Sequence, residues 1–158
     1  MLPPYLMLRT LLEWVGSVGF ALLAGGIVGR GFCLRRLLTV REARMVQATD
    51  KLLWIGAGVL VLPRLALVFS DAGMGRWFYL SNPWQIVQAL LLVLVLALDV
   101  WPARRFRSWE RHLDLDQIPY HTDAVHDRMR LLWKIQVVGL LLLPLFDPLV
   151  RMGFGLSR

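Results

Sequence analysis

The chain has 158 residues, of which 57% are apolar, and it carries a formal net charge of +7 at pH 7. This apolar content and the positive mean hydropathy exceed what a soluble domain of this size normally carries. The length fits one domain, and the single cysteine, Cys33, excludes an intrachain disulfide and a thiolate metal cluster within one copy. Nucleic acid is not an expected partner, because the arginines gather beside apolar stretches and form no basic face of a soluble fold.

Four apolar stretches of about 18 to 20 residues recur along the chain. About 20 helical residues cross the hydrocarbon core of a bilayer, so each stretch is long enough to span the membrane once. We therefore predict an all-α fold, an integral membrane four-helix bundle that forms a single domain over residues 1–158. The predicted helices cover residues 10–29, 52–69, 84–101 and 131–150. The first stretch lacks the features of a cleaved signal peptide, so we expect it to remain as a helix.

The arginines between the predicted helices predict which loops face the cytoplasm. The first and third loops are strongly basic, whereas the short middle loop contains only Arg76. Because basic loops stay on the cytoplasmic side, both termini are expected outside and the segment 103–127 inside. Most tryptophans and tyrosines fall near the ends of the predicted helices, which agrees with this arrangement. The basic residues of the two loops are Arg30, Arg35, Arg36, Arg41, Arg44, Arg104, Arg105, Arg107, Arg111, Arg128 and Arg130.

Three local signals predict where helices begin or end. Thr39 followed by Glu42 is a capping-box pattern, so a helix is expected to start directly after Thr39 and continue into the second span. Pro83 after Asn82 suits the first turn of the third helix. Pro102 suits the end of that helix, because proline lacks the N–H that a helix interior needs.

Small residues recur at every fourth position along the first predicted helix. They are Ser17, Ala21, Gly25 and Gly29. Such a small-residue stripe lets another helix approach closely. It predicts either packing against a helix of the same chain or docking to a helix of another protein, and the sequence leaves both interpretations open.

Charged residues inside the predicted spans are candidates for a site, because a charge in hydrocarbon is costly and normally has a partner or a function. Glu13, Arg64 and Asp147 are expected at a similar depth in the outer half of the membrane. We predict a structural cluster in which Arg64 pairs with Glu13 and its remaining donors bind Asp147. A proton or substrate relay is the alternative interpretation.

A second set of charges is expected near the inner ends of the helices. Asp50, Lys51, Asp99 and Lys134 fall at one level there. They predict an interfacial charge network. No catalytic residue is assigned, because a catalytic role would require a substrate pocket that sequence does not show.

The three histidines, His112, His121 and His126, fall in or beside the predicted cytoplasmic segment. Their spacing does not match a metal-ligand motif, so we predict a solvated loop and no metal site. No histidine falls within a predicted span, which argues against bis-histidine haem ligation in the bilayer. The cofactor is therefore unknown, and haem is kept as an alternative with Met7 or one of these histidines as its ligand.

Four stretches of the chain resemble an uncharacterised bacterial family of four-helix membrane proteins, known as a domain of unknown function. They are ATDKLLWIGAG around Asp50, FYLSNP at 78–83, PARRFRSW at 102–109 and RMGFG at 151–155. The resemblance covers most of the chain and implies an inner-membrane location and the four-helix plan, but no activity. A more distant likeness to four-helix proteins of haem biosynthesis and copper uptake rests on the helix pattern alone.

The chain departs from the pattern of that family at three places. Members often carry His near the start of the first helix and Lys early in the third, where this chain has Met7 or Leu8 and Gln88. The arginine of the second helix falls nearer Leu67 in the family, one turn beyond Arg64. If the family handles haem or ions, these departures imply that this chain has lost part of the polar groups involved.

The leading functional hypothesis is a non-catalytic integral subunit that packs against a larger inner-membrane assembly, respiratory or photosynthetic. There it would help hold lipids, pigments or neighbouring helices. The hypothesis rests on the small-residue stripe, the interfacial tryptophans and the lack of an assembled catalytic set. Membrane lipids and other integral membrane proteins are the expected partners. The alternatives are a small haem- or porphyrin-binding redox protein and an oligomeric transporter.

Overall fold

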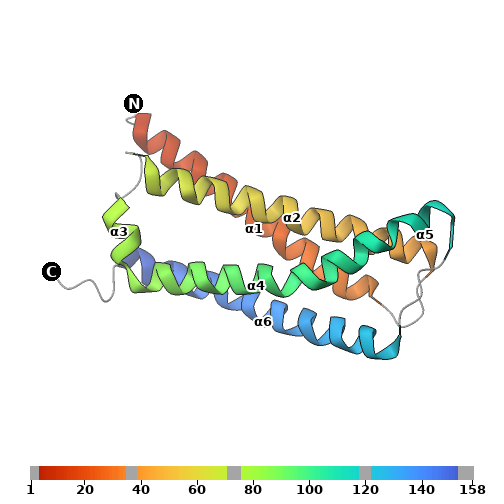
Figure 1. Cartoon of the computed structure of the whole chain (residues 1–158). Coiled ribbons are helices and arrows are strands. Elements are labelled where there is room, and N and C mark those ends of the chain that lie inside the picture. The colour runs from red at the N-terminus through yellow and green to blue at the C-terminus, as the bar shows by residue number, and fades with distance from the viewer. Residues whose placement is uncertain (1–3, 35–38, 71–75, 118–121, 153–158) are drawn as a thin grey trace.

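The computed structural model describes residues 4–34, 39–70, 76–117 and 122–152. In these ranges the chain is helical apart from short connections, and it contains no strand. Four long helices form a bundle, and a short helix lies at each end of it, so we name the two ends the α3 end and the α5 end (Figure 1). The helices are α1 (Pro4–Cys33), α2 (Val40–Phe69), α3 (Arg76–Ser81), α4 (Pro83–Ser108), α5 (Glu110–Asp114) and α6 (Asp123–Met152).

The long helices fit the thickness of a bilayer. The described residues contain four helical stretches that are long and apolar enough to cross a membrane, which confirms the predicted all-α four-helix membrane bundle. α1 begins and α6 ends at the α3 end, so these two helix ends lie on the same side of the bundle (Figure 1). Which side of the membrane this end faces stays a prediction from the arginine pattern.

Local sequence determines where α2 and α4 begin. The backbone nitrogen of Glu42 donates to Thr39 Oγ1 at 3.2 Å, and the backbone nitrogen of Thr39 donates to Glu42 Oε2 at 2.9 Å. These two bonds form the capping box. The backbone nitrogen of Trp84 donates to Asn82 Oδ1 at 3.1 Å, and Pro83 takes the first helical position, where no N–H is needed. Both predicted helix starts are confirmed.

The predicted end of the third span at Pro102 is wrong, because α4 continues through this residue to Ser108. Packing outweighs the one hydrogen bond that a proline removes. Phe106 and Trp109, which follow the proline, are buried in an apolar cluster that also contains residues of α2 and α6. The predicted cytoplasmic segment 103–127 therefore contains the end of α4, all of α5 and the start of α6.

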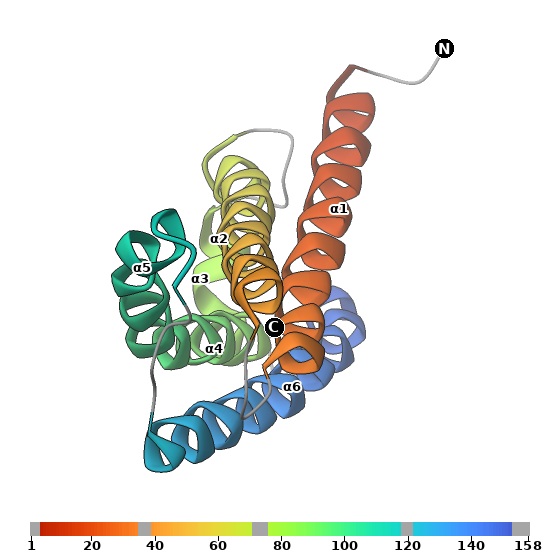
Figure 2. The same ribbon diagram turned by 90° about the vertical axis from the view of Figure 1, so that its right-hand side faces the viewer.

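α1 and α2 approach each other at glycines. An added Cβ at Gly19 would lie 2.3 Å from the backbone nitrogen of Leu60, and one at Gly56 would lie 2.3 Å from that of Leu23. Only a residue without a side chain permits this contact between backbones. α4 packs mainly against α6, so the bundle consists of two helix pairs, which Figure 2 shows from the α5 end.

Apolar side chains of both pairs form two layers in the bundle. The central layer consists of Leu23, Ile27, Leu53, Ala57, Leu60, Leu92, Val95, Leu140 and Leu143. The second layer, nearer the α5 end, consists of Ala43, Val46, Phe106, Trp109, Leu113 and Met129. One group of polar side chains lies between the two layers, and another lies on the α3 side of the central layer.

Candidate functional site

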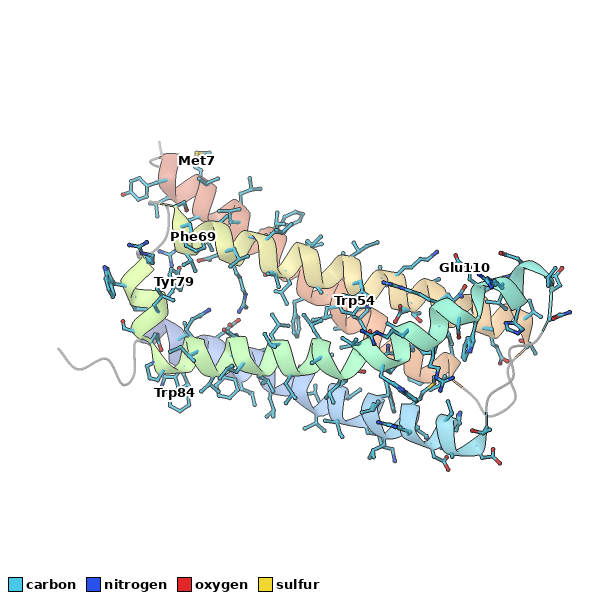
Figure 3. The ribbon with its side chains drawn as sticks, viewed as in Figure 1. Met7, Trp54, Phe69, Tyr79, Trp84 and Glu110 are labelled. Atoms are coloured by element: carbon cyan, nitrogen blue, oxygen red, sulfur yellow. The ribbon has the colours of Figure 1, made fainter. Side chains whose placement is uncertain are left out.

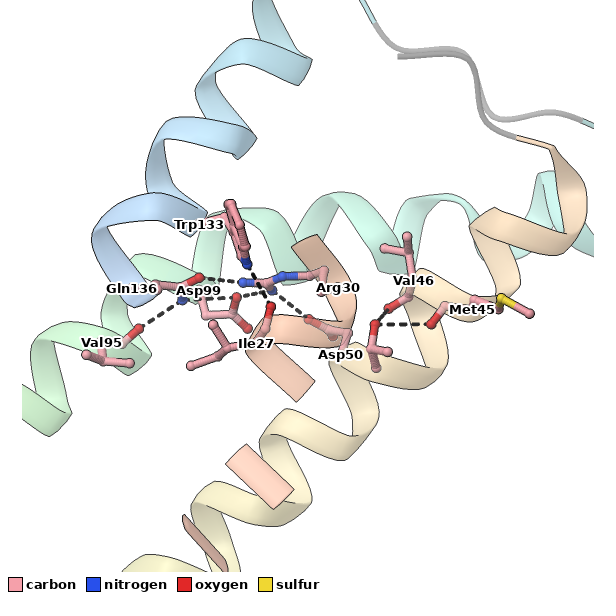
Figure 4. A network of polar contacts seen from close by, with 10 residues as sticks. Ile27, Arg30, Met45, Val46, Asp50, Val95, Asp99, Trp133 and Gln136 are labelled. Carbon is pink, nitrogen blue, oxygen red and sulfur yellow. Dashed lines mark hydrogen bonds and ion pairs between the residues drawn. The ribbon is translucent and has the colours of Figure 1, made fainter. Parts of the chain in front are cut away.

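The first polar group is a buried cluster centred on Arg30. Nη1 of Arg30 pairs with Asp50 Oδ1 at 3.3 Å and with Asp99 Oδ1, and its Nη2 donates to Gln136 Oε1. Figure 4 shows how this one side chain of α1 reaches residues of α2, α4 and α6. Arg30 is 2% exposed, and Asp99 and Gln136 are 0% exposed. Asp50 is 8% exposed, so the Arg30 cluster is almost completely closed to water and lipid.

Further hydrogen bonds tie the Arg30 cluster to the backbone. Gln136 Nε2 donates to the carbonyl oxygen of Val95 at 3.0 Å, and Trp133 Nε1 donates to the carbonyl oxygen of Ile27 at 2.8 Å (Figure 4). Asp99 Oδ2 is buried, and the described residues provide no hydrogen-bond donor for it. Removing one partner of such a buried ion pair leaves an uncompensated charge. The cluster therefore locks the four long helices together.

Only part of the predicted inner charge network belongs to this cluster. Arg30 brings Asp50 and Asp99 together, whereas Lys51 and Lys134 are exposed. Lys51 follows Asp50 directly, so its side chain points about 100° away around the helix. The cation of the network is therefore the arginine and neither lysine.

Arg30 is the residue that the sequence did not assign to a site. The first apolar stretch ends at Gly29, which by sequence places Arg30 in a basic loop, but α1 continues to Cys33 and carries Arg30 into the bundle. A signal for such a cation is present in Gln136, an uncharged polar residue within the predicted span 131–150. A polar side chain in that position needs a partner from another helix.

The second polar group lines a cavity at the α3 end, between the two helix pairs. The cavity has a volume of about 450 Å³, and every helix except α5 contributes to its wall. Tyr79 of α3 is one of its lining residues and is labelled in Figure 3. The charged residues of the lining are Arg9, Glu13, Arg64 and Asp147. The lining residues that also belong to the central apolar layer are Leu60, Leu92 and Leu143.

Gln88 connects Arg64 and Asp147 inside this cavity. Arg64 Nη1 donates to Gln88 Oε1 at 2.9 Å, while Gln88 Nε2 donates to Asp147 Oδ1 at 2.6 Å and to the carbonyl oxygen of Leu143 at 3.1 Å. Arg64 Nη2 lies 3.4 Å from Asp147 Oδ1. Gln88 is buried, but the side chains of Arg64 and Asp147 are 37% and 44% exposed. The two charged groups are held in place and remain accessible.

The expected pairing of Glu13 with Arg64 is not the one that the structure shows. Glu13 Oε1 accepts a hydrogen bond from Arg9 Nε at 3.0 Å, one turn away on α1. A pair at this spacing forms within one helix and needs no approach of another helix. Glu13 and Arg64 line the same cavity, but the described contacts of Arg64 go to α4 and α6.

The closest contact between α1 and α2 does not lie on the small-residue stripe. Only the last part of the stripe faces α2, where an added Cβ at Gly29 would lie 3.1 Å from Thr49 Cγ2. Ser17, Ala21 and Gly25 are exposed, and Gly29 is half-buried. The closest approach to α2 uses the neighbouring face of α1, which includes Gly19. Packing against α2 therefore does not account for the exposed part of the stripe, and docking to another protein stays a prediction.

The described histidines lie at the α5 end, away from the cavity. His112 is exposed on α5, and His126 is buried near the start of α6. His121 lies outside the described residues. Among the residues that the structure describes, no group of three or more His, Cys, Asp or Glu side chains gathers where it could hold a metal ion.

Two departures from the family pattern lie at the cavity. Gln88 stands where the resemblance implies Lys, and Leu67 stands where it implies Arg, and both residues line the cavity. Arg64 lies one turn before Leu67 on α2. The cavity therefore has a cation on α2 at Arg64 and a neutral amide on α4 at Gln88.

Residues 8–155, which cover nearly the whole chain, match a family model described as "Predicted membrane protein (DUF2214)". No curated protein and no solved structure matches the chain. The matched range reaches into all four long helices and contains both polar groups. The chain therefore belongs to the DUF2214 family of predicted membrane proteins.

Proposed function

We propose that the protein is a non-catalytic accessory protein of the bacterial inner membrane that holds an amphiphilic molecule, such as a lipid, in the α3-end cavity. The observation that carries this proposal is the half-exposed pair Arg64 and Asp147, held by Gln88 in a cavity of about 450 Å³. Ligand pockets typically have volumes of about 300–1,000 Å³. The charged groups suit a polar head, and the leucines beside them suit an apolar chain.

The depth of Arg64 supports a bound partner at this site. Arg64 lies five residues before the end of α2 at Phe69, so its Cα is about 8 Å inside the helix end. A charge within a membrane span normally pairs with another group or faces a polar cavity. Arg64 directs Nη1 to Gln88 and Nη2 to Asp147, which leaves part of its five N–H donors for a phosphate or carboxylate group.

The composition of the lining favours binding over catalysis. The described lining residues include no histidine, cysteine or lysine. An arginine and a carboxylate held by one amide do not make a nucleophile with an adjacent base. We therefore assign the charges to holding and orienting a ligand.

Native mass spectrometry of the purified protein tests this proposal. In mild detergent, the wild-type protein is expected to retain an amphiphile, and Arg64→Gln is expected to lose most of it. Arg104→Gln is the matched control, because Arg104 is an exposed arginine near the α5 end. Size-exclusion chromatography establishes that both variants are folded. Equal retention by the two variants would contradict the proposal.

The second part of the proposal is that the protein docks to a larger respiratory or photosynthetic assembly. Ser17, Ala21 and Gly25 are exposed on α1, where a foreign helix can approach closely. Wild-type protein purified from its native membranes should bring a membrane protein with it, and Ala21→Leu should release that protein. A free monomer in the wild-type preparation would rule this part out.

The proposed orientation has both termini in the periplasm and the α5 end in the cytoplasm. It is supported by the basic residues at the α5 end, among them Arg104, Arg105 and Arg107. A reporter that is active only in the periplasm should work when fused after Arg158 and fail when fused after His121. The opposite pattern would reverse the orientation.

The transporter alternative requires a polar path through the bundle. The cavity reaches Leu60, Leu92 and Leu143, which belong to the central apolar layer. This layer lies between the cavity and the Arg30 cluster. The arrangement favours a binding protein over a transporter, because the layer would have to separate before an ion could cross.

The haem alternative requires an axial ligand. Met7 lies on α1 at the α3 end (Figure 3). His112 belongs to α5, and His126 lies near the start of α6 at the α5 end. Met7 therefore cannot share one haem with either described histidine. An absorption spectrum of the purified protein with a Soret band would revive this alternative.

A further inference from the structure

The charged residues of the α3-end cavity balance one another. Arg9 pairs with Glu13 at 3.0 Å along α1, and Arg64 lies 3.4 Å from Asp147 across the bundle. The described lining thus provides cations and carboxylates in equal number. A ligand of one sign would attract one partner of a pair and repel the other, whereas a ligand with both signs can satisfy both partners.

One oxygen of Asp147 has no described partner. The described contacts of Asp147, from Gln88 Nε2 at 2.6 Å and from Arg64 Nη2 at 3.4 Å, both use Oδ1. An ionised carboxylate accepts hydrogen bonds at both oxygens. Because the side chain is also half-exposed, Oδ2 is available to accept hydrogen bonds from a cationic group in the cavity.

Pro148 leaves a backbone carbonyl oxygen of α6 without its usual donor, and this oxygen is a second acceptor near Asp147. Proline has no N–H, so the carbonyl oxygen of Pro144, four residues earlier in α6, lacks its usual helical donor. Pro144 is itself a lining residue of the cavity. A primary ammonium group has three N–H donors and can bind a carboxylate and a carbonyl together. A quaternary ammonium group has none.

Arg64 is positioned to bind an anionic group. Gln88 Oε1 holds Nη1 at 2.9 Å, and the contacts of Arg64 within the described residues do not involve Nε. The planar guanidinium group suits the paired oxygens of a phosphate. Arg9 lines the same cavity and adds a second cation.

We propose that the cavity binds a zwitterion made of a phosphate and a primary ammonium group, which is the chemistry of ethanolamine phosphate. The phosphate binds Arg64, and the ammonium group binds Asp147 and the Pro144 carbonyl. The zwitterion is either the headgroup of a phospholipid or a free molecule. This inference rests on the proposed function and adds the chemical class of the ligand.

Lipid binding to the delipidated full-length protein tests the inference. The probes are phosphatidylethanolamine, phosphatidylcholine and phosphatidylglycerol with identical short acyl chains, and native mass spectrometry measures their affinities. We expect phosphatidylethanolamine to bind about tenfold more tightly than the other two, because each replacement removes a charge-assisted hydrogen bond. This comparison uses only wild-type protein, so it does not depend on the folding of a variant. Equal affinities would overturn the inference.

Two variants separate this inference from the proposed function. Asp147→Asn should remove the preference for ethanolamine over choline, whereas Asp116→Asn should keep it. Asp116 is the matched control, because its Oδ1 pairs with Arg44 Nη2 at 2.7 Å on the exposed surface near the α5 end. An unchanged preference in Asp147→Asn would overturn the inference. The three lipids could also bind the wild-type protein with equal affinity and all bind Arg64→Gln more weakly. That result would overturn the inference and still support the proposed function.

Free ethanolamine phosphate distinguishes the two sources of the zwitterion. If the free compound displaces the bound lipid, the inference is supported and the zwitterion alone is sufficient for binding. If the protein prefers phosphatidylethanolamine but the free compound does not displace the lipid, the inference is supported and the ligand is a phospholipid. If no probe binds and Arg64→Gln behaves as wild type, both the inference and the proposed function are wrong.

Discussion

The two polar groups of this bundle use the same residue types and differ in how completely these residues are enclosed. Each group contains an arginine that contacts one glutamine and one aspartate. In the Arg30 cluster these two partners are Gln136 and Asp99. In the cavity, Arg64 has Gln88 and Asp147 as its partners. The first set is sealed between two apolar layers, whereas the charged members of the second are half-exposed. The two groups therefore differ in enclosure and not in residue type. On this basis we assign the enclosed group to structure and, under the proposed function, the accessible group to ligand binding.

The difference has an energetic consequence. In the sealed cluster, a lost partner leaves a charge that neither water nor lipid can reach, so the full desolvation cost remains. In the cavity, water or a ligand can replace a lost partner. We therefore expect substitutions in the cluster to lower stability, and substitutions in the cavity to change ligand binding more than stability.

The largest effect is expected at Arg30. Arg30→Leu leaves Asp50 and Asp99 without their cation, and we expect the free energy of unfolding to fall by about 3 to 5 kcal/mol. Thermal unfolding in detergent measures this, with Arg104→Leu as the exposed control. If both variants unfold at the same temperature, Arg30 does not lock the bundle.

The two glutamines provide the next comparison. Gln136→Leu removes the acceptor of Arg30 Nη2 and the donor to the Val95 carbonyl oxygen, which should lower stability by about 2 kcal/mol. Gln88→Leu should lower it by about 1 kcal/mol, because its charged partners remain accessible to water, and it should also weaken ligand binding. Urea unfolding in detergent measures the two stabilities. A larger loss for Gln88→Leu would show that the cavity carries more of the stability.

Asp50→Asn tests which of the two aspartates, Asp50 or Asp99, is the main partner of Arg30. Arg30 keeps Asp99 as its partner in this variant, and the repulsion between the two carboxylates is removed. We therefore expect stability to stay within about 1 kcal/mol of the wild type. The same unfolding assay applies. A loss as large as that of Arg30→Leu would make Asp50 the main partner of the cation.

The smallest effect is expected for the pair Arg64 and Asp147. In a double-mutant cycle of Arg64→Leu and Asp147→Leu, the coupling energy should be below about 1 kcal/mol, because both side chains are half-exposed and solvent screens the pair. The corresponding cycle of Arg64→Leu with Glu13→Gln should be additive, because Glu13 pairs with Arg9. Coupling between Arg64 and Glu13 would mean that α1 moves closer to α2 in the membrane.

What the sequence determined about this protein is local. The lengths of the apolar stretches predicted the four membrane helices, and short patterns such as Thr39 with Glu42 predicted where a helix begins. The sequence also identified Asp50, Asp99, Arg64 and Asp147 as charges that need an explanation. These features depend on residues that are neighbours along the chain, so the sequence contains the information for them.

Only the tertiary structure decided which of these charges meet. The partner of a charged side chain depends on how far each helix extends, how it is rotated and where it crosses its neighbours, and the glycine contacts between α1 and α2 set the last of these. Arg30 therefore lies inside the bundle although it follows the apolar stretch in the sequence. Glu13 pairs with Arg9 on its own helix although Arg64 lines the same cavity. Packing around Phe106 likewise carried α4 past Pro102. For Arg30 and for the end of α4, contacts between residues distant in sequence outweighed the local signal, whereas Glu13 kept a partner four residues away on its own helix.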